Sequence, residues 1–224
     1  MTDRQPILWL DLETTDLDPT HGRIVEIAAA ITDAETLTYV GDAYHQLVDP
    51  GRDILTALAE PHGRVDPAIV AMHHQSGLTT DLINQFGATA PGTPVAGGGG
   101  GLLAYFDGLA AVETSLCRWL ERNLEGACHR GGGLAWWPAD RLPWLGGSGP
   151  HFDRRWIVEH MPALGGRLHY RNFDVSTLRR AFDRWAGADL AGGAPPHRAG
   201  SDVVWAIEQA RAARRLLVDA GGAG

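Results

Sequence analysis

The chain contains no lysine, and its 19 basic residues are all arginine. Together with 29 glycines, this bias is typical of a GC-rich genome and does not by itself indicate a mechanism. Acidic residues outnumber basic ones, and the net charge is −8. A protein that tracks along a long nucleic acid by its phosphate backbone needs a basic surface, so this charge argues against that class. Short oligonucleotides, held at a few points, remain compatible with it.

Cysteine is also scarce. Cys117 and Cys128 have neither C-x-x-C nor zinc-site spacing, which predicts a reduced protein interior. The N-terminus does not resemble a signal peptide, and no apolar run reaches the length of a membrane span. We therefore expect a cytoplasmic protein that does not enter a membrane.

The pattern of elements predicts one α/β domain over residues 1–224, because a chain of this length buries one substantial core. Glycine-rich segments around 87–101 and around 126–142 predict two insertions. The expected strands are 7–13, 23–32, 39–48 and 142–145, and the expected helices are 67–85 (broken at Ser76–Gly77), 102–124, 153–160, 175–185 and 201–217. The expected apolar face of 102–124 is Leu102, Phe106, Leu109, Val112, Leu116 and Leu120, and that of 201–217 is Val203, Val204, Ile207, Ala210, Leu216 and Leu217.

Two carboxylates, Asp11 and Glu13, lie at the end of the first predicted strand, in I-L-W-L-D-L-E-T-T. Side chains alternate along a strand, so both point to the same face. Neighbouring carboxylates repel unless a cation or a proton lies between them, and Mg²⁺ and Mn²⁺ prefer oxygen ligands. The pair therefore predicts a metal site, and the alternative is two solvated acids in a turn.

A third carboxylate, Asp153, begins an amphipathic segment after G-G-S-G-P. Aspartate is a common helix N-cap, and this capping role is the alternative to a functional one, although the two do not exclude each other.

His197 and Asp202 are five residues apart in P-P-H-R-A-G-S-D, before and within the first turn of the last predicted helix. A loop histidine suits a general base, because its ordinary pKa is near 6.5. The alternative is a surface histidine with an acid that compensates the helix dipole. Four carboxylates and a base, all at the ends of elements, together predict a site that holds two divalent metals and activates water.

These motifs, in this order, resemble the DEDDh 3′–5′ exonucleases, which have a ribonuclease H-like core. The strings R-I-V-E-I-A-A-A-I-T-D, F-D-R-R-W-I-V-E-H-M-P-A-L and L-H-Y-R-N-F-D-V-S-T-L are similar to the oligoribonuclease family within that group. The resemblance covers about residues 7–85 and 143–217. It implies a mixed sheet flanked by helices, two Mg²⁺ or Mn²⁺ ions, and cleavage of very short single-stranded RNA, chiefly dinucleotides, to mononucleotides.

The resemblance also implies roles for the five motif residues. Asp11 would bridge both metals, Glu13 and Asp202 would complete the first metal site, and Asp153 would support the second. His197 would deprotonate the attacking water.

Further positions match substrate-binding residues of the family. Arg171, Ser176 and Thr177 match a cap on the terminal phosphate of the substrate, and a guanidinium with two hydroxyls is chemically suited to that role. Their alternatives are a surface ion pair for Arg171 and helix caps for the two hydroxyls. Leu17 matches a leucine that acts as a wedge against a base, and His73 and Ser76 in M-H-H-Q-S-G-L match residues on the substrate side. Tyr170 matches a tyrosine that reaches into the partner of a homodimer, and its alternative is a buried strand aromatic.

The chain also departs from the family. Ala68 stands where the family has a tryptophan that stacks on a base, and the loop before Asp153 has Ser148, Gly149 and Phe152 in place of Asn, Ser and Gln. Trp136 and Trp137 in the second insertion could replace the stacking surface, or pack on their own domain or a dimer partner. A broader exonuclease on single-stranded DNA or RNA and an inactive nucleic-acid-binding module therefore remain as alternatives.

Overall fold

The computed structural model describes residues 5–59, 65–87, 102–125, 141–190, 193–194 and 196–221. Both predicted insertions lie almost entirely outside these residues, since only Gly87 of the first and residues 141–142 of the second are described. Cys128 and the proposed stacking residues Trp136 and Trp137 also lie outside them.

The centre of the described chain is a five-stranded sheet of order β3-β2-β1-β4-β5. Strands β1 to β3 are antiparallel, and β4 and β5 are parallel to β1 and β4, respectively. The predicted mixed sheet flanked by helices is confirmed. The strands are β1 Pro6–Thr14, β2 Ile24–Asp33, β3 Tyr44–Leu47, β4 Trp144–Gly147 and β5 Asn172–Asp174.

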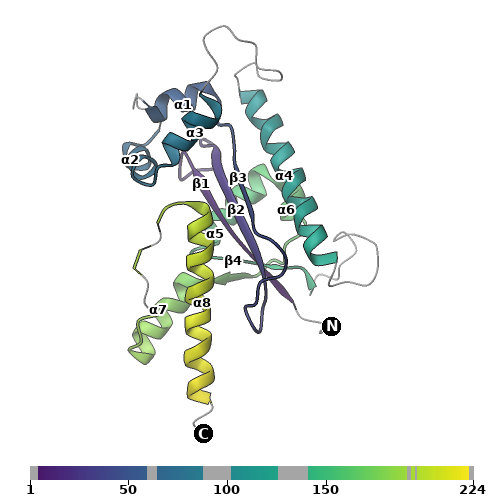
Figure 1. Cartoon of the computed structure of the whole chain (residues 1–224), viewed down its shortest axis with the longest axis vertical. Helices are drawn as coiled ribbons and strands as arrows, with labels where there is room; N and C mark the ends of the chain where they lie inside the picture. The colour runs from purple at the N-terminus through teal and green to yellow at the C-terminus, as the bar shows by residue number, and fades with distance from the viewer. Residues whose placement is uncertain are drawn as a thin grey trace.

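Helices cover both faces of this sheet, and a small helical group lies at one end of it (Figure 1). Helices α4, α5 and α6 pack on one face, α8 packs on the other, and α1 to α3 form the group at the end. The helices are α1 Arg52–Ala59, α2 Pro67–Gln75, α3 Leu78–Phe86, α4 Leu102–Glu125, α5 His151–His160, α6 Pro162–Gly165, α7 Val175–Ala186 and α8 Ala199–Gly221.

Strand β1 is buried on both faces because it lies in the middle of the sheet. Leu8 and Leu10 pack in the core under α4 and α5, whereas Ile7 and Trp9 pack against α8. Side chains alternate along a strand, so odd-numbered residues of β1 face α8. Gly146 of β4 leaves room for the side chains of Ile7 and Trp9. A Cβ at this position would lie 2.6 Å from Ile7 Cγ2 and 2.9 Å from Trp9 Cε3, which is too close.

The predicted apolar faces of two helices are partly wrong. On α8, Val204 and Leu217 are more than half exposed, and the helix packs on the sheet mainly through alanines. Small side chains allow the helix to approach the sheet closely, and a hydrophobicity pattern gives alanine too little weight. On α4, Phe106 is 42% exposed, whereas Tyr105 and Trp119 are buried. The residues of α8 that pack are Ala199, Val203, Ala206, Ile207, Ala210 and Ala213.

Several boundaries also differ from expectation. The predicted strand at 39–48 is confined to Tyr44–Leu47, with one isolated bridge between Thr32 and Tyr39. The predicted strand at 142–145 begins two residues later, at Trp144. The sequence does not predict α1, α6 or β5, which are short and depend on packing. Within the described residues, no helix combines the length and the apolar character that crossing a bilayer requires.

Candidate active site

Three carboxylates meet where the end of β1 faces the beginning of α8. One oxygen each from Asp11, Glu13 and Asp202 lies within 4.8 Å of the other two. Asp11 and Glu13 share the α8 face of β1, as the period of two predicts. Asp202 lies in the first turn of α8, which is anchored on the same face by its buried alanines. Strand geometry and helix packing thus bring together residues almost 190 positions apart in the sequence.

The proximity of these groups opposes their ionisation. Burial, followed by repulsion from Asp153, Glu13 and Asp202, holds the pKa of Asp11 well above its ordinary value. Burial and the same kind of repulsion raise the pKa of Glu13 to about 8. Without a cation, this cluster keeps protons at neutral pH, and a cation would replace them.

Asp202 gives the clearest sign that a cation fits. Its Oδ1 atom is buried and has no hydrogen-bond partner among the described residues. Burial raises the pKa of Asp202 to about 6, against lowering effects of His197 and of nearby backbone N–H groups. A buried oxygen without a donor is unfavourable unless a ligand completes it. Because the converging donors are carboxylate oxygens, the site fits a hard divalent cation.

Asp153 lies beside this trio but outside it. It is 4% exposed, and its Oδ1 accepts a hydrogen bond of 3.1 Å from the backbone N–H of Leu12. Burial raises its pKa to about 7. The alternative of a helix N-cap is wrong, because α5 begins at His151 with Pro150 as its N-cap and places Asp153 in the first turn. The structure therefore positions this carboxylate next to β1.

His197 is exposed in the loop that leads into α8. Its backbone φ of 57° lies in the left-handed region, which is uncommon for a residue other than glycine. The backbone N–H of Asp202 donates to the carbonyl of Arg198 at 2.9 Å, which keeps the loop of His197 next to the first turn of α8. The role of His197 as a general base stays a prediction.

His73 lies behind Glu13 and is fully buried. Its ring Nε2 lies 2.9 Å from the carbonyl oxygen of Thr14, and its Nδ1 lies 3.9 Å from Glu13 Oε2 without a hydrogen bond. Burial lowers the pKa of His73, which favours the neutral imidazole. Ser76 donates its hydroxyl to the carbonyl of His73 at 3.3 Å. Direct contact of these two residues with a substrate stays a prediction.

Leu17 projects from the loop after β1 and is 68% exposed. The loop is tied to α5 at two points. Arg155 Nη2 donates to the carbonyl of Leu17 at 3.2 Å, and His160 Nε2 lies 2.6 Å from the carbonyl of Pro19. Contact of Leu17 with a base stays a prediction.

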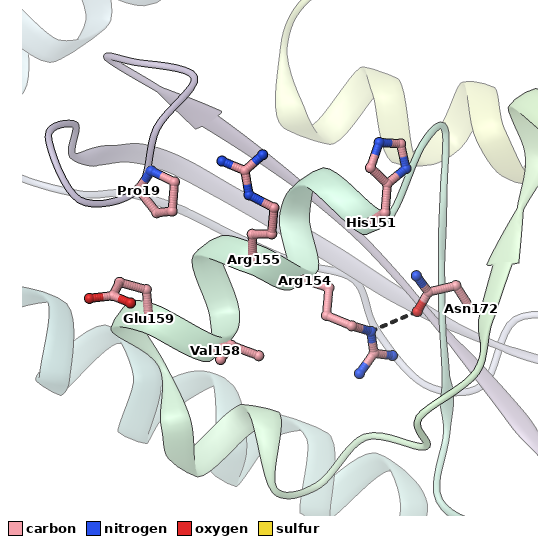
Figure 2. A pocket seen from close by; sticks show the side chains of 7 residues that line it. All are labelled: Pro19, His151, Arg154, Arg155, Val158, Glu159 and Asn172. Atoms are coloured by element: carbon pink, nitrogen blue, oxygen red, sulfur yellow. Dashed lines mark hydrogen bonds between the residues drawn. The ribbon is translucent and has the colours of Figure 1, made fainter.

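A shallow basic pocket lies beside this loop (Figure 2). Figure 2 shows Arg154 and Arg155 on successive positions of α5, with Arg154 Nε bonded to Asn172 Oδ1 at 2.7 Å. The sequence does not predict this pocket, because it forms only when the loop after β1, α5 and β5 come together. Its lining residues are Pro19, His151, Arg154, Arg155, Val158, Glu159 and Asn172.

The predicted phosphate cap lies around the beginning of α7. The hydroxyls of Ser176 and Thr177 donate to the two carboxylate oxygens of Asp174, at 2.7 and 2.8 Å. Asp174 is the N-cap of α7, so the alternative that either hydroxyl residue caps this helix is wrong. Ser176 and Thr177 lie in the first turn of α7, where both hydroxyls donate to the same carboxylate group, that of Asp174.

Arg171 and Tyr170 lie on the segment that precedes β5. Arg171 Nε donates to the hydroxyl of Tyr170 at 2.9 Å, and the guanidinium lies 5.4 Å from the centre of the tyrosine ring. Tyr170 is 74% exposed, so the alternative of a buried strand aromatic is wrong.

The sequence also does not predict a role for Glu26, although a single acid within the apolar run R-I-V-E-I-A was a usable signal.

The raised pKa values predict that the metal-free protein becomes less stable as the pH rises from about 5 to about 8. Unfolded carboxylates lose their protons near pH 4, whereas Asp202, Asp153 and Glu13 keep theirs until about pH 6, 7 and 8 in the folded protein. Buried His73, whose pKa is lowered, acts in the opposite direction, but one histidine is outweighed by the carboxylates, so the folded state binds more protons across this window. The pKa values of Glu26 and Asp174 are lowered, so these two groups change the stability only below this pH range.

Thermal unfolding in EDTA and in Mn²⁺ at pH 5 and pH 8 measures this effect. We expect the midpoint in EDTA to fall with rising pH, and Mn²⁺ to raise it more at pH 8 than at pH 5, because the metal then replaces fewer protons. A midpoint in EDTA that rises steadily between these pH values contradicts the arrangement.

Sequence comparison relates the chain to known nucleases. The exonuclease family model RNase_T matches residues 8–85, which run from within β1 to within α3 and include β2, β3, α1 and α2. The oligoribonuclease of Neisseria meningitidis serogroup B is 29% identical over 215 residues, covering 94% of this chain and 91% of that protein. The oligoribonuclease of Pseudomonas aeruginosa is 30% identical over 186 residues, covering 83% of this chain and 80% of that protein.

Solved structures share the fold. An exonuclease I from Methylocaldum szegediense superimposes with a TM-score of 0.57 at 17% identity, and E. coli exonuclease I in complex with an oligonucleotide with 0.56 at 16%. They cover 94% and 95% of this chain, which spans only about 40% of their length. This likeness confirms the expected fold. The sequence identity over most of both chains establishes more: the chain belongs to the oligoribonuclease family of 3′–5′ exonucleases.

Proposed function

We propose that the protein degrades very short single-stranded RNA from the 3′ end, with dinucleotides as favoured substrates, and releases 5′-mononucleotides by hydrolysis at two divalent metal ions. The observation that carries this proposal is the convergence of Asp11, Glu13 and Asp202, with one buried oxygen of Asp202 unsatisfied, in a chain of the oligoribonuclease family. Mg²⁺ and Mn²⁺ both suit these ligands.

The carboxylates divide between two metal positions. Asp11, Glu13 and Asp202 would hold one ion, and Asp153 together with Asp11 would hold the second. Bound metal ions supply positive charge for the phosphate and lower the pKa of water. Each carboxylate is fixed by β1, α5 or α8, which keeps the ligands in place before any substrate arrives.

His197 acts as the general base. It is exposed, close to Asp202, and its loop position lets the imidazole approach a water molecule at the metal site. Histidine exchanges a proton near neutral pH, which the buried carboxylates do not do while they hold metals.

The phosphate cap recognises the end of the substrate. Arg171 is exposed and offers its remaining N–H groups to a terminal phosphate, while the hydroxyls of Ser176 and Thr177 turn from Asp174 to the ligand. The surrounding segment is basic in an otherwise acidic chain, since seven of the 19 arginines and only four acids lie between residues 151 and 185. Leu17 limits the other side by packing against a base.

A broader exonuclease on single-stranded RNA or DNA is the second candidate, and one observation favours it. Ala68 is exposed on α2, where the family has a stacking tryptophan. Base–aromatic stacking contributes about 1–3 kcal/mol per base, so its loss weakens selection for a dinucleotide. An inactive binding module is less compatible with the site, because buried repelling carboxylates destabilise a protein that has no use for metals.

A homodimer completes the proposal. On α7, Trp185 is 85% exposed, and Leu178 and Phe182 on the same face are only half-buried. Tyr170, on the segment before β5, is also exposed. A second copy that covers this surface would bury its apolar side chains and bring Tyr170 to the partner's site.

Trp185→Arg is expected to convert a dimer into a monomer of 24.1 kDa, because it places a charge in the proposed interface. Sedimentation equilibrium measures the mass, and Val158→Arg, at an exposed position of α5, serves as a control that remains dimeric. A wild-type protein that is monomeric at micromolar concentration would contradict the proposed dimer, and the proposed hydrolysis at the metal site would be unaffected.

The function is tested with a 5′-phosphorylated RNA dinucleotide, incubated with the protein in Mn²⁺ or in EDTA. Chromatography should show two 5′-mononucleotides in Mn²⁺ and intact dinucleotide in EDTA. Products with 3′-phosphates, or undiminished cleavage in EDTA, would show that a different hydrolysis takes place.

A further inference from the structure

Glu26 is buried in the middle of the sheet, beside the carboxylate cluster, yet outside it. It pairs with Glu13 in the register of β1 and β2, so the two side chains share the α8 face. Glu26 is 1% exposed. A buried carboxylate is costly unless it is fully paired, so its partners should show what it does.

Those partners come from the loop that carries His197. Arg198 donates Nη2 to Glu26 Oε1 at 2.9 Å and Nε to both oxygens at 3.2 Å. The backbone N–H of Ala199, the first residue of α8, donates to Oε2 at 3.0 Å. His45 Nε2 lies 2.7 Å from Oε1. Although burial raises it, these hydrogen bonds hold the pKa of Glu26 below its ordinary value.

Arg198 extends the contact to the helical group at the end of the sheet. Its Nη1 lies 2.8 Å from Asp81 Oδ2 on α3 and 3.4 Å from the carbonyl oxygen of Ser76. The guanidinium thus joins β2, α3 and the beginning of α8. His197 directly precedes it, and its left-handed backbone is a conformation that such a residue holds only when its surroundings enforce it.

We propose that Glu26 is a positioning residue for His197: its buried carboxylate clamps Arg198 and the first amide of α8, and thereby sets the place of the general base beside Asp202. The inference rests on the proposed role of His197. The buried alanines of α8 hold the helix that carries Asp202 on the sheet, and the backbone N–H groups of His197 and Arg198 also act on its carboxylate. Because the charge of Glu26 also adds to the repulsion among Asp11, Glu13 and Asp202, the dependence on Mn²⁺ is measured separately from the effect on the base.

The test begins with Glu26→Gln, which keeps the shape and removes the charge. We expect kcat on the RNA dinucleotide at saturating Mn²⁺ to fall about 10- to 100-fold, as for a misplaced base, while KM changes less than about 3-fold. Glu121→Gln is the matched control, because Glu121 binds Nε and Nη2 of Arg167 at 3.0 and 2.8 Å away from the site. This control should keep the wild-type kcat.

The double variant with His197→Ala separates positioning from a general structural role. If Glu26 acts through His197, adding Glu26→Gln to His197→Ala lowers kcat less than about 2-fold further, whereas independent effects multiply. Arg198→Ala should behave in the same way and is the second variant if Glu26→Gln does not fold. The Arg198 side chain is 24% exposed, so water can reach the space it leaves, and Glu26 keeps its contacts with His45 and the amide of Ala199.

Three results overturn the clamp: wild-type kcat in Glu26→Gln, wild-type kcat in Arg198→Ala, or losses that multiply with His197→Ala. A fourth result is distinguishable from these. If His197→Ala itself keeps the wild-type rate, the proposed role of His197 fails first, and the clamp has no base to position.

Discussion

Asp11→Asn is expected to abolish cleavage of every substrate while the protein keeps its fold. Asp11 belongs to the carboxylate cluster with Glu13 and Asp202, and its pKa is raised by burial first and then by repulsion from Asp153, Glu13 and Asp202. An amide keeps the shape but loses the charge that a shared metal position requires, and we expect kcat to fall about 10³-fold or more. Removal of one repelling carboxylate should also raise the thermal midpoint of the metal-free protein at pH 8.

Kinetics with Mn²⁺ and thermal unfolding in EDTA measure the two effects on the same preparation. Asp107→Asn, at an exposed position of α4, is a control that makes the same chemical change away from the site. Activity within 10-fold of wild type in Asp11→Asn would remove the two-metal assignment. A collapse of the fold would show instead that Asp11 has a structural role.

Arg171→Ala is expected to slow cleavage of a 5′-phosphorylated dinucleotide about 10- to 100-fold, and to change cleavage of a heptanucleotide less than about 3-fold. A hydrogen bond to a charged group contributes about 1.5–3 kcal/mol, and only a dinucleotide places its terminal phosphate at the cap. A longer strand has other contacts to compensate for the lost guanidinium.

The ratio of kcat/KM for the two substrates is the quantity to measure. Arg180→Ala, an exposed arginine on α7, controls for the general loss of one positive charge near the site. If Arg171→Ala slows both substrates equally, the arginine attracts RNA without recognising its end. An unchanged ratio would then leave the broader exonuclease as the better description.

Local periodicity made part of the site predictable. The period of two in β1 places Asp11 and Glu13 on one face, and the helical pattern places Asp202 in the first turn of α8. Both follow from short segments of sequence. Their meeting does not, because it depends on which face of the sheet α8 covers, and the alanines that decide this carry a weak signal.

Contacts between segments that are far apart in the chain could not be predicted from the sequence. Glu26 and Arg198 are 172 residues apart, and no pattern within either segment relates them. The loop of Leu17 is likewise held by Arg155, 138 residues away. Asp174 explains the placement of Ser176 and Thr177 better than helix capping by the hydroxyls does, because one carboxylate receives both. Tertiary packing thus determines how the predicted residues are held.

The most direct test of the account is a digestion of 5′-phosphorylated RNA from two to about ten nucleotides, with matching DNA, in Mn²⁺. Initial rates at equal concentration are compared by length. The account predicts that the RNA dinucleotide is cleaved fastest and that DNA is cleaved more slowly, because the cap fits a substrate with its terminal phosphate one nucleotide from the scissile bond. Equal or faster cleavage of longer strands or of DNA would contradict the cap and establish a broader exonuclease.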